Sequence, residues 1–247
     1  MIMMRNRYRL CELFGIPIFV DISFAILLLI FMMDFGSFTF GIAAALTLAI
    51  SVTLHELGHA LTARAFGYRT NDITLSLLGG CASLIALPRK AWQEFLTALA
   101  GPLVSFAISL AVFMLDVLEI QIENAWLRHV LAYAFYMNVM LGAFNLLPGF
   151  PMDGGRIFRS VMRAFMSRPK ATLVAMWVGR VFAVLLALRA VHSIFTGGGW
   201  GFITLMIAWM IWREGYREYQ MALREESWDR WTQDDFNARV SPPPYDR

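Results

Sequence analysis

The stretch Leu54-His55-Glu56-Leu57-Gly58-His59 decides how the rest of this chain is interpreted. Two histidines four residues apart on a helix project from the same face, so both imidazoles can reach one Zn²⁺ ion. The glutamate after the first histidine lies off that face and can act as a general base without being a ligand. Because this motif fixes only three residues, chance matches occur, and the surrounding sequence decides its meaning.

The sequence around the motif is apolar on both sides. Residues 40–50 carry almost wholly apolar side chains, and an alanine-rich stretch follows at residues 60–66. Ionisable side chains are costly inside an apolar span and usually mark a functional site. A bound metal that offsets the burial of His55, Glu56 and His59 therefore explains the motif better than packing does.

The composition is that of a membrane protein. Of the 247 residues, 58% are hydrophobic and 16% are charged, whereas soluble domains carry about 25% charged residues. About 20 apolar residues cross a bilayer as a helix. We therefore predict an α-helical polytopic membrane protein with about six spans, at residues 18–33, 38–66, 92–117, 129–147, 171–195 and 200–212.

One region between these spans has the pattern of strands. Residues 72–77 alternate polar and apolar side chains, Gly79-Gly80 suits a turn, and an apolar run follows at residues 81–87. We predict a small membrane-associated β-hairpin here, the alternative being an ordinary interfacial loop. Residues 8–22 are expected to be extended rather than helical.

The charges of the loops orient this array. One side of the membrane would hold most of the basic residues, namely Arg5, Arg7, Arg9, Arg64, Arg69, Arg89, Lys90, Arg156, Arg159, Arg163, Arg168, Lys170, Arg213 and Arg217. By the positive-inside rule both termini are then cytoplasmic, which requires an even number of spans. We expect a multi-pass protein of the cell membrane, with basic residues that serve topology rather than nucleic-acid binding.

The predicted topology also suggests a third metal ligand. A catalytic zinc typically has three protein ligands and one open position. His129 and His192 fall on the side of the membrane away from His59, whereas Asp153 follows the fourth span at a similar depth, in a glycine-rich turn. We therefore predict one zinc ion per chain, held by His55, His59 and Asp153.

The motif at residues 55–59, together with Asn145-Leu146-Leu147-Pro148 and Asp153-Gly154, resembles the site-2 protease family of intramembrane zinc metalloproteases, peptidase family M50. The resemblance covers about residues 8–215. It implies that Glu56 is the catalytic base and that Asn145 holds substrate or stabilises the oxyanion. Many members carry Asn where this chain has Ser105, which leaves the role of that residue open.

The resemblance also implies a substrate and a domain organisation. The substrate would be a single-span protein, such as a membrane-tethered anti-sigma or transcription factor, cleaved in regulated intramembrane proteolysis. We expect a metalloprotease domain at residues 1–215, with its core at 38–155, and a cytoplasmic polar tail at 216–247. A regulatory CBS pair or PDZ domain is not expected. An exposed strand of the hairpin at residues 72–87 would hold the unwound substrate by β-augmentation, and substitutions through residues 75–77 are expected to impair cleavage while zinc stays bound.

Other functions are consistent with parts of the pattern. A catalytically silent scaffold with a structural metal would have no use for Glu56 beside the histidines. A transporter would be expected to show inverted repeats, and none is seen in the sequence. A prenyl-protein endopeptidase would take its third ligand from a later glutamate on a helix rather than from Asp153. Arg180 and Arg189, inside the fifth predicted span, have no explanation at this level.

Overall fold

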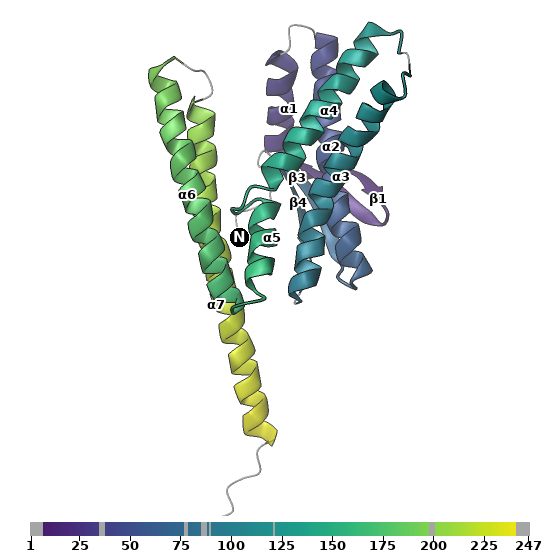
Figure 1. The fold of residues 1–247 in the computed structure, drawn as a ribbon. Coiled ribbons are helices and arrows are strands. Elements are labelled where there is room, and N and C mark those ends of the chain that lie inside the picture. Colours follow the sequence, from purple (N-terminus) through teal and green to yellow (C-terminus); the bar gives the residue numbers. More distant parts are fainter. Residues whose placement is uncertain are drawn as a thin grey trace, which may run out of the picture. The chain divides into compact units, whose positions relative to one another are not determined.

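The computed structural model describes residues 7–34, 38–76, 79–84, 88, 90–120, 122–197 and 201–240. The chain divides into two compact units, residues 1–147 and residues 148–247 (Figure 1). The elements of the first unit are β1 (Arg7–Leu13), β2 (Ile16–Asp21), α1 (Ile22–Asp34), α2 (Phe38–Ala65), β3 (Thr70–Ser76), β4 (Gly79–Leu84), α3 (Ala91–Val117) and α4 (Ala125–Asn145).

The four strands form one sheet in the order β1-β2-β3-β4, with β2 and β3 parallel and the outer pairs antiparallel. The predicted hairpin is confirmed as β3 and β4, but its Gly79-Gly80 turn is wrong. Gly79 pairs with Ser76 and Gly80 with Leu75, so both glycines lie in β4. The connecting residues 77–78 and the predicted residues 85–87 lie outside the described part of the chain.

The predicted extended segment at residues 8–22 is a second hairpin, β1–β2. Its turn residues Phe14 and Gly15 have φ angles of 52° and 75°. Two consecutive residues with positive φ are typical of the tight turn that joins antiparallel strands. The pairing of this hairpin with the β3–β4 hairpin was not predicted, because β2 and β3 pair only through the crossover formed by α1 and α2.

The core of the first unit lies where this sheet packs against α2. Ile16 and Ile18 of β2 and Ile73 of β3 are almost completely buried, and they cluster with Val52 and Leu57 of α2. Alternate residues of a strand point to one face of a sheet, so the inward residues of β2 and β3 form one apolar layer. That layer fixes α2, the helix of the His-Glu motif, against the sheet.

The second unit contains α5 (Asp153–Met162), α6 (Arg168–Phe195) and α7 (Gly201–Val240). Helix α5 was not predicted, because Gly154 and Gly155 disfavour a helix. Helix α7 runs unbroken from the sixth predicted span to residue 240, so the expected tail is helical over most of its length. Residues 241–247 of that tail lie outside the described residues.

Helices cover most of each of the six predicted spans, but residues 18–21 of the first predicted span belong to strand β2. The helices also differ in whether they are long and apolar enough to cross a membrane. Among the described residues, α2, α3 and α6 are long and apolar enough to do so. Helix α1 has 13 residues, or about 20 Å at 1.5 Å per residue, against about 30 Å of hydrocarbon. The chain is an integral membrane protein, and the count of six spans stays a prediction.

A buried ion pair joins α5 to α7 in the second unit. Arg159 is 1% exposed, and its guanidinium donates to the Glu218 carboxylate at 2.8 Å. The guanidinium also lies over the ring of Phe150, 5.0 Å from the ring centroid. Burial alone would raise the pKa of Glu218, but Arg159, Arg156 and Arg168 together hold it below its ordinary value.

We predict that Glu218→Gln lowers the thermal stability of the purified protein at pH 7, because it removes the carboxylate that the buried Arg159 guanidinium bonds at 2.8 Å. The expected loss is about 3 kcal/mol. Since the folded pKa is lowered, the stabilisation is complete above the ordinary pKa of a glutamate and disappears as the pH falls through the lowered value. Thermal unfolding of wild type and variant should therefore converge at acidic pH.

Glu214→Gln is the matched control for this prediction. Glu214 pairs with Arg217 on the exposed surface of the same helix at 3.0 Å, and exposed pairs contribute at most about 1 kcal/mol. Equal destabilisation by the two variants would show that the loss of a negative charge on α7, rather than the buried pair, controls stability.

Candidate active site

The two histidines of the motif lie side by side on α2, as predicted. Their ring centroids are 4.9 Å apart and the rings are inclined at 80°. His55 is 2% exposed and His59 is 7% exposed. Two adjacent imidazoles this deeply buried need partners for their ring nitrogens.

Helix α3 supplies one hydrogen-bond partner for the Nδ1 atom of each histidine. His55 Nδ1 lies 2.9 Å from the Ser105 hydroxyl oxygen. His59 Nδ1 lies 2.7 Å from the backbone carbonyl oxygen of Thr97. A carbonyl only accepts, so His59 carries its proton on Nδ1, and its Nε2 atom is the one with a lone pair for a metal.

Gly101 of α3 makes room for the opposite edges of both rings. A Cβ atom built on Gly101 would overlap His59 Nε2 and would lie 2.7 Å from His55 Nε2. The two Nε2 atoms therefore face the same small space above a residue that has no side chain. The close packing at Gly101 therefore serves the two imidazoles directly.

A second glycine brings the two helices together. A Cβ on Gly58 of α2 would lie 2.9 Å from the carbonyl oxygen of Ala100. Gly58 lies between the histidines in the motif, and Gly101 follows Ala100 in α3. The close approach of α2 and α3 thus depends on one small residue in each helix, as is common in membrane helix pairs.

Glu56 is buried on α2 next to His55, with 9% of its surface exposed. Successive residues of a helix are rotated by about 100°, so its carboxylate leaves the helix on a different side from the imidazoles. This position suits a base that acts near a metal-bound water without being a ligand. The role of Glu56 as the base stays a prediction.

The turn after α4 holds the other two predicted site residues. Asn145 is the last residue of α4, half-buried, and its Nδ2 donates to the Leu141 carbonyl at 2.9 Å. Asp153 was expected inside a glycine-rich turn, but it is the first residue of α5 and is 7% exposed. The helix N-terminus favours its negative charge.

Backbone contacts fix the start of α5 within the second unit. A Cβ on Gly155 would lie 2.7 Å from the Gly149 carbonyl carbon, and a Cβ on Gly149 would lie 2.9 Å from the Gly179 Cα. The turn is therefore packed between α5 and α6 without intervening side chains. The glycines of this segment position Asp153 through the backbone rather than by making the residue itself flexible.

The structure also identifies polar residues whose roles the sequence analysis did not assign. Ser105 is completely buried and bonds His55. One turn before His55 on α2, Ser51 accepts a hydrogen bond from the Asn138 side chain of α4 at 2.9 Å, and Asn138 is also completely buried. For Ser51 the available signal was a small polar residue in an apolar helix, four residues before the motif.

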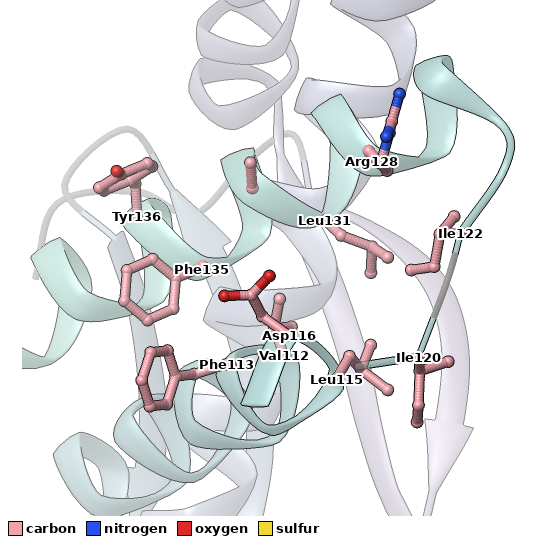
Figure 2. A pocket seen from close by; sticks show the side chains of 11 residues that line it. Val112, Phe113, Leu115, Asp116, Ile120, Ile122, Arg128, Leu131, Phe135 and Tyr136 are labelled. Atoms are coloured by element: carbon pink, nitrogen blue, oxygen red, sulfur yellow. The ribbon is translucent and has the colours of Figure 1, made fainter. Parts of the chain in front are cut away.

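A cavity of about 310 Å³ lies between the ends of α3 and α4 (Figure 2). Its polar side chains include Asp116 and Arg128, with Phe113, Phe135 and Tyr136 among the rest of its lining. None of the predicted site residues lines it. It is therefore separate from the space above Gly101.

The chain is similar in sequence to known zinc metalloproteases. The family model of peptidase family M50 matches residues 43–121 and 114–188. A putative zinc metalloprotease of Synechocystis sp., sll0528, is 30% identical over 97% of this chain and 66% of its own length. The zinc metalloprotease MJ0392 of Methanocaldococcus jannaschii is 34% identical over 77% of this chain and 56% of its own length.

A solved structure is similar as well. The site-2 protease from Methanocaldococcus jannaschii aligns with a TM-score of 0.64 at 30% identity, covering 87% of this chain and 95% of that one. The chain spans 66% or less of the length of the first curated relatives it matches. The similarity therefore concerns the part of those relatives that contains the His-Glu motif.

We predict that Ser105→Ala weakens zinc binding about 10- to 100-fold, because His55 loses the hydroxyl group that bonds its Nδ1 atom and orients its ring. The measurement is a zinc titration of detergent-purified protein against a competing chelator. Ser109→Ala is the matched control, since its hydroxyl donates to the carbonyl oxygens of Ser105 and Phe135 and to no histidine. An unchanged zinc affinity in Ser105→Ala would contradict this positioning role.

Proposed function

This chain belongs to peptidase family M50, among the site-2 proteases, and from that premise we propose that it is a zinc-dependent intramembrane endopeptidase. The observation that carries the proposal is the pair of buried imidazoles whose Nδ1 atoms are engaged by α3 and whose Nε2 atoms face Gly101. Glu56 lies buried beside them. A purely structural metal site does not need a carboxylate in that position.

We propose that His55, His59 and Asp153 bind one zinc ion. Among the described residues, these buried side chains provide three donors of the kind that can hold a metal ion. Two imidazole nitrogens and one carboxylate oxygen are typical of catalytic zinc sites, which keep a fourth position open. Bound there, zinc would lower the pKa of a water ligand and polarise the scissile carbonyl group.

Glu56 then acts as the proton carrier of the reaction. Its carboxylate accepts a proton from the attacking water as the oxygen bonds to the carbonyl carbon of the scissile peptide. It passes that proton to the amide nitrogen as the carbon–nitrogen bond breaks. The products are a new carboxyl terminus and a new amine, and Glu56 is regenerated as a carboxylate.

Asn145 is the proposed donor to the tetrahedral oxyanion. Its amide nitrogen has two hydrogens, and the bond to the Leu141 carbonyl uses one of them. The other hydrogen is left to stabilise negative charge on the substrate oxygen. The bond to Leu141 holds the amide in one orientation, and this preorganisation favours such a role.

The proposed substrate is a single-span membrane protein, cut within or near its span, such as a membrane-tethered anti-sigma or transcription factor. A substrate helix must unwind before its carbonyl groups can react, and a sheet edge can hold the unwound strand. Strand β3 is not such an edge, because it lies between β2 and β4 and Leu75 is 1% exposed. The docking strand that we propose is therefore β4.

Zinc content and cleavage together test the site. We expect about one zinc per chain in wild type and in Glu56→Gln, and loss of zinc in Asp153→Ala. Cleavage should fall by about 10²- to 10⁴-fold in Glu56→Gln, because the proton carrier is lost while the metal stays. The assay uses a tagged single-span protein with helix-breaking residues in its span, reconstituted with the protein in vesicles.

The possible results separate the parts of the proposal. If Asp153→Ala keeps a full complement of tightly held zinc, the third ligand is wrong. If wild type holds zinc but cleaves no member of a panel of such substrates, the metal site stands and the protease proposal fails. If Glu56→Gln cleaves as fast as wild type, the assigned base is wrong.

The docking strand has its own test. The backbone amides of adjacent residues in an edge strand alternate between facing the neighbouring strand and facing outward. One of the two single variants, Cys81→Pro or Ala82→Pro, therefore removes an outward amide. We expect that variant to lose cleavage while zinc content stays at wild-type level. Leu10→Pro in β1, at the opposite edge of the sheet, is the control, and equal loss there would contradict docking at β4.

A further inference from the structure

Arg180 is a charged residue in the middle of α6, a helix long and apolar enough to cross a membrane. The structure places its guanidinium between two indole rings. The centroid of Trp177 lies 4.8 Å from the guanidinium carbon, and that of Trp212 in α7 lies 4.5 Å away. Stacking stabilises the faces of the cation but gives no acceptor to its N–H groups, which lie along its edge.

The described part of the chain offers no anion to that edge. Arg180 Nε is buried without a hydrogen-bond partner, and none of the ion pairs between described residues includes Arg180. The buried Arg159, by contrast, has Glu218. A guanidinium that is stacked on two rings yet lacks an acceptor is suited to bind an anion from outside the chain.

A second arginine lies beside this group. Arg213 follows Trp212 in α7, and its guanidinium carbon is 5.3 Å from the centroid of Trp209. The neighbouring carboxylate of Glu214 is bonded by Arg217, at 3.0 and 3.1 Å. The charge of Arg213 therefore adds to that of Arg180.

The sequence of α7 changes from apolar to charged beside this group. Residues 202–212 are apolar except for one threonine, and charged residues begin at Arg213. Trp177, Trp209 and Trp212 are each about half-exposed. Tryptophan and arginine at an apolar-to-charged boundary are typical of the membrane–water interface, where lipid phosphates lie.

We propose that a cluster of three tryptophans and two arginines binds the phosphate group of an anionic phospholipid. This Trp–Arg cluster consists of Trp177, Arg180, Trp209, Trp212 and Arg213. The two terminal NH2 groups of Arg180, rather than its buried Nε atom, donate to the phosphate oxygens in the bidentate manner that suits a guanidinium. The exposed indoles flank the lipid at the level of its headgroup. Two arginines disfavour the cationic group of a zwitterionic lipid, so the cluster should prefer an anionic one.

The experiment measures lipid association with the full chain reconstituted in phosphatidylcholine vesicles. Trace spin-labelled phosphatidylglycerol or phosphatidylcholine is added, and electron spin resonance gives the motionally restricted fraction of each. Wild type should restrict phosphatidylglycerol preferentially. Arg180→Gln should reduce that preference about five-fold, the effect expected for one arginine at the surface of an anionic lipid.

Arg189→Gln is the matched control. Arg189 is an exposed arginine on the same helix, and no ring stack or ion pair is found for it among the described residues. It should leave the lipid preference at the wild-type value. An equal loss in Arg180→Gln and Arg189→Gln, or no loss in Arg180→Gln, would overturn the proposal.

Two further variants keep the test decisive if Arg180→Gln fails to fold. Arg180→Lys retains the charge without the planar donor edge, and it should give a preference between those of wild type and a neutral residue. Trp212→Leu removes one face of the stack at an exposed position and should also lower the preference. Wild-type preference in both folded variants would overturn the proposal.

Discussion

The site depends on the way in which α3 holds the two imidazoles of α2. Each histidine gives its Nδ1 atom to α3, one to the Ser105 hydroxyl and one to the Thr97 carbonyl. Both rings then turn their Nε2 atoms toward Gly101. Without the Nδ1 partners, two buried imidazoles would be free to rotate, and the space above Gly101 would not present two nitrogens at once.

That constraint accounts for the packing of the first unit. The α2–α3 approach needs Gly58 and Gly101, since a methyl group at either position would overlap the opposite helix or its side chains. The sheet holds the other side of α2 through buried residues of β2 and β3. Helix α2 is therefore confined from two directions, and the motif is built on rigid elements.

Much of the site was predictable because its chemistry is local in sequence. His55, Glu56 and His59 lie within five residues of one helix, so their spacing alone predicts a shared metal and a separate base. The role of Ser105 was not predictable, because it depends on the register between α2 and α3. Asp153 was placed in the right segment but in the wrong local structure, since two glycines follow it in the first turn of its helix.

The fold, like the site, was predictable where its signals are local in sequence. Apolar runs predicted the positions of the long helices, and alternation predicted β3 and β4, because both signals are local. The pairing of β2 with β3 is set by the crossover between them, and helix α5 is stabilised by the Arg159–Glu218 pair across 59 positions of sequence. Contacts of that range leave no periodic trace in a single sequence.

The surroundings of two arginines in the second unit can be explained by the cost of burying a charge without a counter-ion. Arg159 is buried and has a carboxylate partner, as an arginine shielded from water requires. Arg180 is stacked between two indoles and has no such partner among the described residues. The same electrostatics apply to both side chains, but only Arg159 has a carboxylate partner among the described residues. This difference argues that the counter-ion of Arg180 comes from the bilayer. In that sense the bilayer is part of the folded structure of this protein.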